Sequence, residues 1–358
     1  MQKADGMNYA PQGIPRPVVK AGEFAFGVCH LDHGHIFGMC NGLTEAGGEL
    51  RYIFDPQPER ASDMQHKFPS AQILGSEAEL LDKTDIQLIA AAAVPSERGP
   101  LGCRVMEHGK DYFTDKTPFT TLVQLDQARE RVKRTGKKYA VYYSERLHVE
   151  CAVFAGQLIN DGVIGRVIQV IGLGPHRHGA PGSRPAWFYE REKYGGILCD
   201  IGSHQVEQYL YYSGATDAVV NHAAVGNYRF PEYPEFEDYG EASLTGNNDT
   251  TQFYRVDWHT PDGLGTWGDG RTIILGTQGY IEMRKYIDVA RDTAGNHLYL
   301  VNEKGEQHLE LTGKVGYPYF GELILDSLNR TEKAMTQEHT FKAAELCLLC
   351  QEAAKRLG

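Results

Sequence analysis

The segment from Gly195 to Gln205 carries the residues best suited to acid–base chemistry. It reads GGILCDIGSHQ, with Asp200 and His204 four positions apart. We predict that the glycines open a helix that continues through Val206, so both side chains lie on one helical face. A histidine can take the proton of a hydroxyl group while hydride leaves, and a nearby carboxylate can orient the imidazole. An Asp–His pair that only caps a helix end is the simpler alternative.

A second candidate is the segment Asp115-Lys116-Thr117-Pro118, which directly follows a predicted strand. Ligands of α/β proteins bind at the carboxyl ends of parallel strands. A lysine there can hydrogen-bond a reacting hydroxyl, so Lys116 is a candidate for both catalysis and cofactor contact. A surface lysine before a proline turn is the structural alternative.

A polar loop, HLDHGH, separates the first predicted strand from the first predicted helix. In a dinucleotide-binding fold the pyrophosphate lies at this point, on the helix N-terminus. The usual G-x-G-x-x-G is absent, because non-glycine residues occupy all three glycine positions and only one glycine lies between them. We predict that the loop residues still contact a nucleotide: His30, Asp32, His33, Gly34 and His35.

Two further residues are candidate cofactor contacts. Asp55 ends the second predicted strand, about 25 residues after the loop, where a carboxylate would bind the adenosine ribose. Because a carboxylate repels a 2′-phosphate, NAD is expected rather than NADP. Val94 ends the apolar strand predicted at 86–94. A turn residue before Pro56 is the alternative for Asp55.

The loop histidines also raise the possibility of a metal site. His30, His33 and His35 lie within six residues, together with Asp32. Side chains packed this closely in one short loop rarely point at one centre. We therefore predict no metal ligands and a polar loop that lines the cofactor or substrate site.

Substrate contacts are expected from loops that follow strands. Arginine or histidine donors beside an aromatic platform suit a polyhydroxylated ring or a carboxylated sugar. Arg177 and Arg184 could equally hold their loops by bonds to the backbone. The candidates, besides Asp200 and His204, are Tyr143, Arg146, His176, Arg177, Arg184 and Trp187.

The predicted elements fall into two groups. Up to about residue 145, strands alternate with helices, which is typical of a doubly wound parallel sheet. The strands are predicted at 23–29, 50–54, 71–74, 86–94, 111–114 and 138–143. After that point a helix at 149–160 is followed by strands in direct succession, and a helix at 340–356 closes the chain. Successive strands indicate a large, mostly antiparallel sheet.

We therefore predict an extended arm over residues 1–21, a nucleotide-binding domain over 22–145 and a substrate and oligomerisation domain over 146–358. The formal net charge of −11 disfavours nucleic acid and anionic membranes as partners. There is no apolar run of membrane-spanning length. Seven scattered cysteines fit reduced thiols in the cytoplasm.

The two motifs together resemble one family. Asp115-Lys116-Thr117-Pro118 is similar to the Glu-Lys-Pro motif of the glucose–fructose oxidoreductase, inositol dehydrogenase and rhizopine catabolism (Gfo/Idh/MocA) family. The GGILCDIGSH segment resembles its G-G-x-x-x-D-x-G-x-H motif, and the later GTQGYIE segment resembles its G-T-x-G strand. The resemblance covers roughly residues 22 to 357. The departures are aspartate for glutamate, the additional Thr117 and the missing loop glycines.

The resemblance implies a nicotinamide-dependent oxidoreductase that acts on a hydroxyl of a sugar or cyclitol. It implies that Lys116 positions the substrate hydroxyl, that His204 is the general base and that Asp200 orients substrate or His204. It also implies a homodimer or homotetramer formed through the large sheet. Three alternatives stay open: a metal-dependent lyase or isomerase, a lyase or isomerase that retains NAD, and a sugar sensor without catalysis.

Overall fold

The computed structural model describes residues 5–180 and 182–358, and its two compact units are described separately. The N-terminal unit comprises Met7–Tyr142 and Gly316–Phe341, and the sheet unit contains Tyr143–Val315 and Lys342–Gly358. The predicted boundary after residue 145 lies close to this division. The sequence did not indicate that the segment Gly316–Phe341 belongs with the N-terminal unit. The first four residues of the predicted arm lie outside the described residues.

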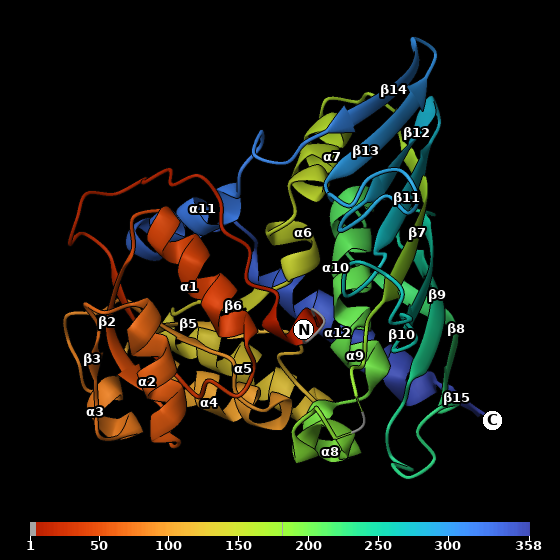
Figure 1. The fold of residues 1–358 in the computed structure, drawn as a ribbon. Helices are drawn as coiled ribbons and strands as arrows, with labels where there is room; N and C mark the ends of the chain where they lie inside the picture. The colour runs from red at the N-terminus through yellow and green to blue at the C-terminus, as the bar shows by residue number, and fades with distance from the viewer. Residues whose placement is uncertain (1–4, 181) are drawn as a thin grey trace. The chain divides into compact units, whose positions relative to one another are not determined.

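The N-terminal unit is built on a six-stranded sheet with strand order β3-β2-β1-β4-β5-β6. All its strand pairs are parallel, and helices lie on both faces (Figure 1). This order is that of a Rossmann fold. The strands are β1 (Ala25–Cys29), β2 (Glu49–Phe54), β3 (Gln72–Ile73), β4 (Leu88–Ala91), β5 (Asp111–Asp115) and β6 (Tyr139–Tyr142). The predicted parallel sheet is thus confirmed.

Five helices connect these strands. They are α1 (His35–Glu45), α2 (Pro58–Lys67), α3 (Glu77–Leu81), α4 (Pro95–Glu107) and α5 (Leu122–Thr135). Helix α4 begins at Pro95, in the first turn, where the missing N–H of proline costs nothing. A further helix, α11 (Pro318–Asn329), packs on α1. A Cβ atom at Gly42 would lie 2.4 Å from the Phe320 ring, so glycine permits this close approach.

The predicted arm lies along α1 of its own chain. Gly13 donates its backbone N–H to the Glu45 carboxylate at 2.9 Å, and Asn41 donates to the carbonyl of Pro11 at 3.0 Å. At the other end of α1, a Cβ atom on Gly34 would lie 2.5 Å from the carbonyl oxygen of Met7. Glycine is therefore needed at the helix start for the arm to pass.

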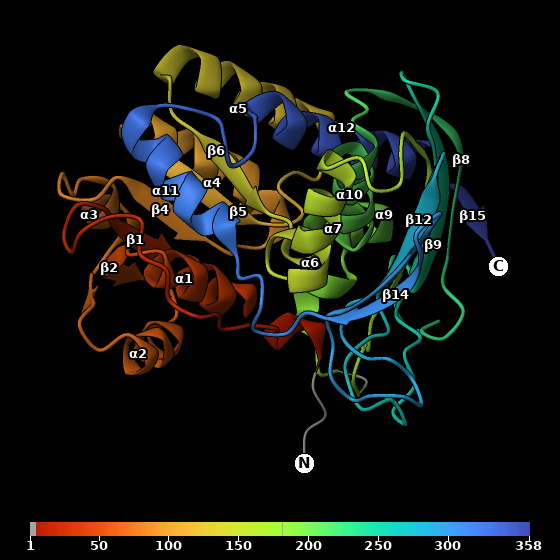
Figure 2. The ribbon, with the colours of Figure 1, turned by 90° about the horizontal axis from the view of Figure 1, so that it is seen from above.

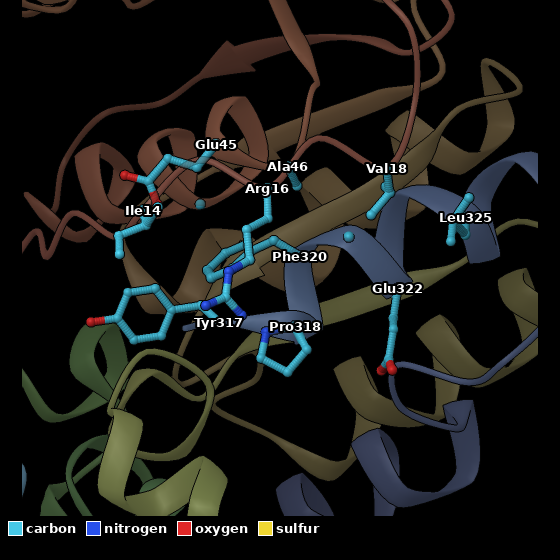
Figure 3. A pocket seen from close by; sticks show the side chains of 12 residues that line it. Ile14, Arg16, Val18, Glu45, Ala46, Tyr317, Pro318, Phe320, Glu322 and Leu325 are labelled. Carbon is cyan, nitrogen blue, oxygen red and sulfur yellow. The ribbon is translucent and has the colours of Figure 1, made fainter. Parts of the chain in front are cut away.

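A pocket of about 250 Å³ lies between the arm, α1 and α11 (Figure 3). Its walls are mainly apolar, with Ile14 and Val18 from the arm and Phe320 from α11. It borders Glu45 at the C-terminal end of α1, at the opposite end of that helix from the histidine loop. This pocket is therefore not part of the candidate site.

The sheet unit contains a nine-stranded mixed sheet of order β14-β13-β12-β11-β7-β10-β9-β8-β15. Most pairs are antiparallel, and β10–β7 and β15–β8 are parallel. Its strands are β7 (Val167–Pro175), β8 (Ala218–Gly226), β9 (Tyr239–Gly246), β10 (Thr251–Asp257), β11 (Arg271–Gly276), β12 (Gly279–Arg284), β13 (His297–Asn302), β14 (Gly305–Glu310) and β15 (Lys355–Leu357). The prediction of a large, mostly antiparallel second sheet is confirmed.

Helices cover one face of this sheet (Figure 2). Those that pack on it are α7 (Glu150–Asn160), α9 (Ile197–Asp200) and α10 (Gly202–Ser213). The unit also contains α6 (Ser144–Leu147), α8 (Arg191–Tyr194) and the short 3₁₀ helix Ala186–Tyr189. The last long helix of the chain is α12 (Gln337–Ala353). Helices on one face leave the other face of the sheet to be covered by something else or by water.

No helix among the described residues is long and apolar enough to cross a membrane. All seven cysteines are buried free thiols.

Candidate functional site

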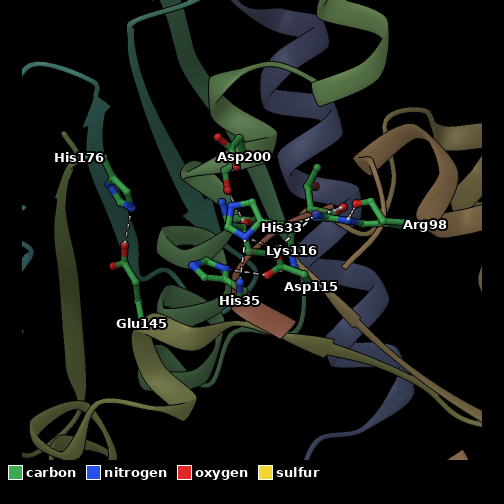
Figure 4. Close-up of polar contacts among 11 residues, drawn as sticks. His33, His35, Arg98, Asp115, Lys116, Glu145, His176 and Asp200 are labelled. Atoms are coloured by element: carbon green, nitrogen blue, oxygen red, sulfur yellow. Dashed lines mark hydrogen bonds and ion pairs between the residues drawn. The ribbon is translucent and has the colours of Figure 1, made fainter. Parts of the chain in front are cut away.

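In the N-terminal unit, a buried cluster forms around Asp115 at the carboxyl end of β5 (Figure 4). We call His33, His35, Arg98, Asp115 and Lys116 the Asp115 cluster. The Asp115 side chain is fully buried and Arg98 is 1% exposed. Nδ1 of His35 lies 2.9 Å from one carboxylate oxygen of Asp115, and Nη2 of Arg98 lies 3.3 Å from the other. The histidine loop and the lysine motif, about 80 residues apart in sequence, therefore meet in one place.

The Asp115 cluster holds the backbone of Lys116 from both sides. The Lys116 N–H donates to the Asp115 carboxylate at 2.8 Å, and the Lys116 carbonyl accepts from the Arg98 guanidinium. Arg98 also donates to the carbonyl of Ala93 at 2.7 Å. The position of Lys116 is thus fixed by charge-assisted bonds in a buried environment, which is what a residue that orients a reacting group requires.

Protonation states in this cluster follow from its geometry. Nδ1 of His33 accepts the backbone N–H of His35 at 3.2 Å, so this nitrogen carries no proton. Burial, and then the neighbouring His35, lower the pKa of His33 well below its usual value. Burial alone would raise the pKa of Asp115, but the charges of His35 and Arg98 outweigh it and hold that pKa well below its usual value. Asp115 is therefore a carboxylate at neutral pH.

The same residues include a possible metal-ligand set. One ligand atom each from His33, His35 and Asp115 lie within 4.8 Å of one another. However, the Asp115 carboxylate already accepts bonds from His35, Arg98 and the Lys116 amide. A cation would have to displace these donors beside a guanidinium. The arrangement favours a satisfied hydrogen-bond network over a metal centre.

The other loop residues also have partners within the protein. His30 pairs with Glu77 at 2.7 Å, and Asp32 pairs with Arg60 at 2.5 Å. The fully buried carboxylate of Asp55 accepts the backbone N–H of Leu31 at 2.6 Å. Asp55 therefore holds the loop from the end of β2. Val94 is the residue immediately before α4.

Breaking this cluster should cost stability. In Arg98→Met the buried Asp115 carboxylate loses its guanidinium, and we expect the free energy of unfolding to fall by about 3–5 kcal/mol. Urea denaturation followed by circular dichroism measures the change. The matched control is Arg104→Met in the same helix, whose exposed pair with Glu77 should contribute at most about 1 kcal/mol. Equal effects of the two substitutions would contradict this account of Arg98.

In the sheet unit, the Asp200/His204 segment forms the short helix α9 followed by the longer helix α10, rather than one helix. Helix α9 ends at Asp200 and α10 begins at Gly202, with Ile201 in right-handed helical conformation between them. His204 is 2% exposed and Asp200 is 9% exposed. The Ser203 hydroxyl donates to the Asp200 carbonyl at 2.8 Å, which fixes the junction. Lys116 belongs to the other unit, so the structure describes the two motifs separately.

A second buried cluster lies in the sheet unit and comprises Glu145, His176, Gln205 and Lys285. We call it the Glu145 cluster. Nζ of Lys285, whose side chain is fully buried, lies 2.8 Å from Oε2 of Glu145. The Gln205 amide donates to the same oxygen at 3.1 Å. Nε2 of His176 lies 4.0 Å from Oε1, and the two side chains point toward each other in Figure 4.

The three arginines predicted to bind substrate are already engaged within the unit. Arg146 forms a two-pronged pair with the buried Glu207, at 2.7 and 2.9 Å from Nε, and stacks on Tyr211. Arg184 donates to the carbonyls of His178 and Arg177, both at 2.9 Å. Arg177 donates to the carbonyl of Leu264 at 2.7 Å. Arg177 and Arg184 therefore hold their loops, the second of the two roles that the sequence left open.

The other predicted substrate contacts differ in exposure. Tyr143 is completely buried, and His176 is 6% exposed with its ring 4.5 Å from that of Trp267. Trp187, on the 3₁₀ helix Ala186–Tyr189, is partly exposed. Sequence reasoning did not select Arg98 or Lys285, which pattern alone does not distinguish from surface cations.

The chain is similar to proteins of known family. The model of the GFO/IDH/MocA C-terminal domain matches residues 153–282, within the sheet unit. A solved structure from Erwinia carotovora atroseptica SCRI1043, of a protein assigned as an oxidoreductase, is 48% identical; it covers 94% of this chain and 100% of its own, with a TM-score of 0.90. The chain belongs to the Gfo/Idh/MocA family. The family predicted from the two motifs is thus confirmed.

Two other similar proteins are named for an enzymatic activity. Scyllo-inositol 2-dehydrogenase (NAD(+)) of Bacillus subtilis (strain 168) is 28% identical over 195 residues, and the match spans about half of each protein, 54% of both lengths. The aldose–aldose oxidoreductase of Caulobacter crescentus, solved with glycerol, is 18% identical with a TM-score of 0.75, over 92% of this chain and 97% of its own. At that identity the likeness concerns the Gfo/Idh/MocA fold.

Proposed function

We propose that this Gfo/Idh/MocA protein is a NAD(P)-dependent oxidoreductase that transfers a hydride between a nicotinamide and a hydroxyl of a sugar or cyclitol. The observation that carries the proposal is the pair of buried motifs: Lys116 fixed at the carboxyl end of β5, and His204 on α10 after Asp200. Similarity to an inositol dehydrogenase supports the reaction class.

The position of the histidine loop fits a dinucleotide. It lies at the carboxyl end of the central strand β1, and α1 starts directly after Gly34, so the helix N-terminus would meet the pyrophosphate. The negative charge of Asp32 is compensated by Arg60. Arg60 also lies 4.0 Å from Asp55, so two carboxylates share one guanidinium. The surplus negative charge there favours NAD over NADP.

The bound nicotinamide would supply the hydride acceptor, and the chain's own residues would handle the substrate hydroxyl. Lys116 donates a hydrogen bond to the hydroxyl oxygen and orients it. His204 accepts the hydroxyl proton as the C–H bond breaks, and returns it in the reverse direction. Asp200 orients substrate or His204. Held in buried surroundings, these groups need little reorganisation during the reaction.

We infer the substrate class from the side chains of the sheet unit that are not already engaged by protein acceptors. Because Arg146, Arg177 and Arg184 are engaged by protein acceptors, these three arginines do not form a preformed clamp for a strongly anionic substrate. His176 and Trp187 stay as proposed contacts for a neutral polyol ring, whereas Tyr143 is completely buried. A panel of aldoses, cyclitols and their acid derivatives with NAD, followed at 340 nm, tests the proposal. Turnover of acids alone would contradict the neutral class.

The alternatives predict different outcomes in the same assay. A metal-dependent lyase or isomerase would lose activity with a chelator and keep it without NAD. An enzyme that retains NAD would convert substrate without net NADH formation. A sensor would bind sugars without turnover.

We also propose that the protein forms a homodimer or homotetramer through the helix-free face of the nine-stranded sheet. Large apolar side chains are exposed along its strands: Ile168, Val219, Phe253, Leu275 and Tyr280. In a monomer these would stay in water, whereas packing of two such sheets would bury them.

A further inference from the structure

The Glu145 cluster contains a charge pair to which the proposed reaction gives no role. Glu145 is 1% exposed and Lys285 is 2% exposed. Removing two charges from water is expensive and adds little net stability, so a buried ion pair is weak evidence of a stabilising role. Perturbed, buried ionisable groups gather at functional sites more often than elsewhere. The pair therefore invites a functional explanation.

A hydrogen bond links Glu145 to α10, the helix that carries His204. Glu145 lies in α6, directly after the last Rossmann strand, and its Oε2 accepts the side-chain amide of Gln205, the residue next to His204 on α10. Oε1 of Glu145 is buried and has no hydrogen-bond partner among the described residues. This oxygen faces Nε2 of His176 at 4.0 Å. Oε2 of Glu145 is thus held by Gln205 and Lys285, whereas the negative charge on Oε1 is not used in a hydrogen bond.

The charges around Glu145 affect its protonation and that of His204. Burial would raise the pKa of Glu145, but Lys285, His204 and His176 together outweigh it and lower that pKa to about 2. The attraction is mutual, so the Glu145 carboxylate must favour protonated His204 by the same interaction. The negative charge of Asp200 acts on Arg184. The other buried charges on α6 and α10, Arg146 and Glu207, neutralise each other.

We propose that Glu145 is a positioning residue for His204, and that Lys285 fixes its carboxylate and moderates its charge. The role in catalysis rests on the proposed function. The electrostatic part does not, because it concerns the protonation of His204 in the protein without substrate.

The test is the pKa of His204, measured by NMR of the imidazole carbons in the full-length protein. The chain has 14 histidines, so the His204 signal is identified by its absence in His204→Gln. In Glu145→Gln, His204 loses a carboxylate and keeps a lysine nearby. Its pKa should fall by about one pH unit.

A second variant separates charge from damage to the fold. In Glu145→Gln/Lys285→Met both charges are gone, so the pKa of His204 should return toward that of the wild-type protein. Glu150→Gln is the matched control: this buried carboxylate caps backbone amides of residues 313 and 315, and its loss should leave the His204 pKa unchanged. Circular dichroism reports whether each variant is folded.

Two results would overturn the proposal: a His204 pKa that does not move in Glu145→Gln, or a double variant that stays at the single variant's value. Where turnover is found, the acidic limb of kcat/KM for oxidation should move to lower pH in Glu145→Gln, because a base with a lower pKa stays unprotonated in more acidic solution. Shifts in the NMR titration without any turnover would sustain the electrostatic coupling and reject the proposed function.

Discussion

Replacing His204 with glutamine will lower kcat for alcohol oxidation by roughly 100- to 10,000-fold, the range that general acid–base catalysis contributes. Glutamine keeps a polar side chain of similar length but cannot take the hydroxyl proton. Nucleotide affinity should change little, because His204 lies on α10 of the sheet unit, whereas the histidine loop belongs to the N-terminal unit. Initial rates at saturating substrate, with nucleotide titration in parallel, measure both quantities.

The matched control for this substitution is His222→Gln. His222 lies on β8, half exposed, and pairs with Glu241 at 3.1 Å. Its replacement should leave kcat within about twofold of the wild-type value. If His204→Gln retained full turnover, another group would be the base and the mechanism proposed above would be wrong.

Lys116→Met should have the second largest effect. Methionine matches the length of the lysine stem but removes the donor that orients the substrate hydroxyl, so we expect kcat/KM to fall roughly 100- to 1,000-fold, comparable to the loss of one oriented donor at a reacting oxygen. The backbone bonds to Asp115 and Arg98 do not involve the side chain and should persist. Unfolding by urea checks that stability is retained.

Lys133→Met, in the exposed last turn of α5, is the control for removing a lysine. It should leave kcat/KM unchanged. Restoration of part of the activity of Lys116→Met by added alkylamines would support a direct role of the ammonium group. An unchanged kcat/KM in Lys116→Met would remove this residue from the site.

The parallel sheet of the N-terminal unit could be predicted because most of its strands are short apolar runs that alternate with helices. β1 and β4 are buried along their whole length, which is typical of central parallel strands. The edge strand β14 could not be predicted from its own pattern, since GEQHLE is mostly charged or polar. The return of Gly316–Phe341 to the N-terminal unit depends on contacts such as that of Gly42 with Phe320, which no local pattern reveals.

In the candidate site too, local sequence patterns predicted some features, and others depend on tertiary contacts. Motif spacing was enough to select Lys116, Asp200 and His204 as candidates. The residues around them could not be predicted, because Arg98 reaches the Lys116 carbonyl, and Lys285 reaches Glu145, only through the fold. The histidine loop illustrates this: its residues suggest phosphate or metal contacts, while the structure directs His35 at Asp115, 80 residues away.

Nucleotide binding is the property on which the proposed function depends most directly. Mass spectrometry of the purified protein shows whether nucleotide is already bound, and calorimetric titration with NAD and NADP then gives the affinities of the emptied protein. The proposal predicts saturable binding of one nucleotide per chain, tighter for NAD than for NADP. No binding of either, with no nucleotide carried through purification, would contradict an oxidoreductase and leave the metal-dependent enzyme or the sugar sensor.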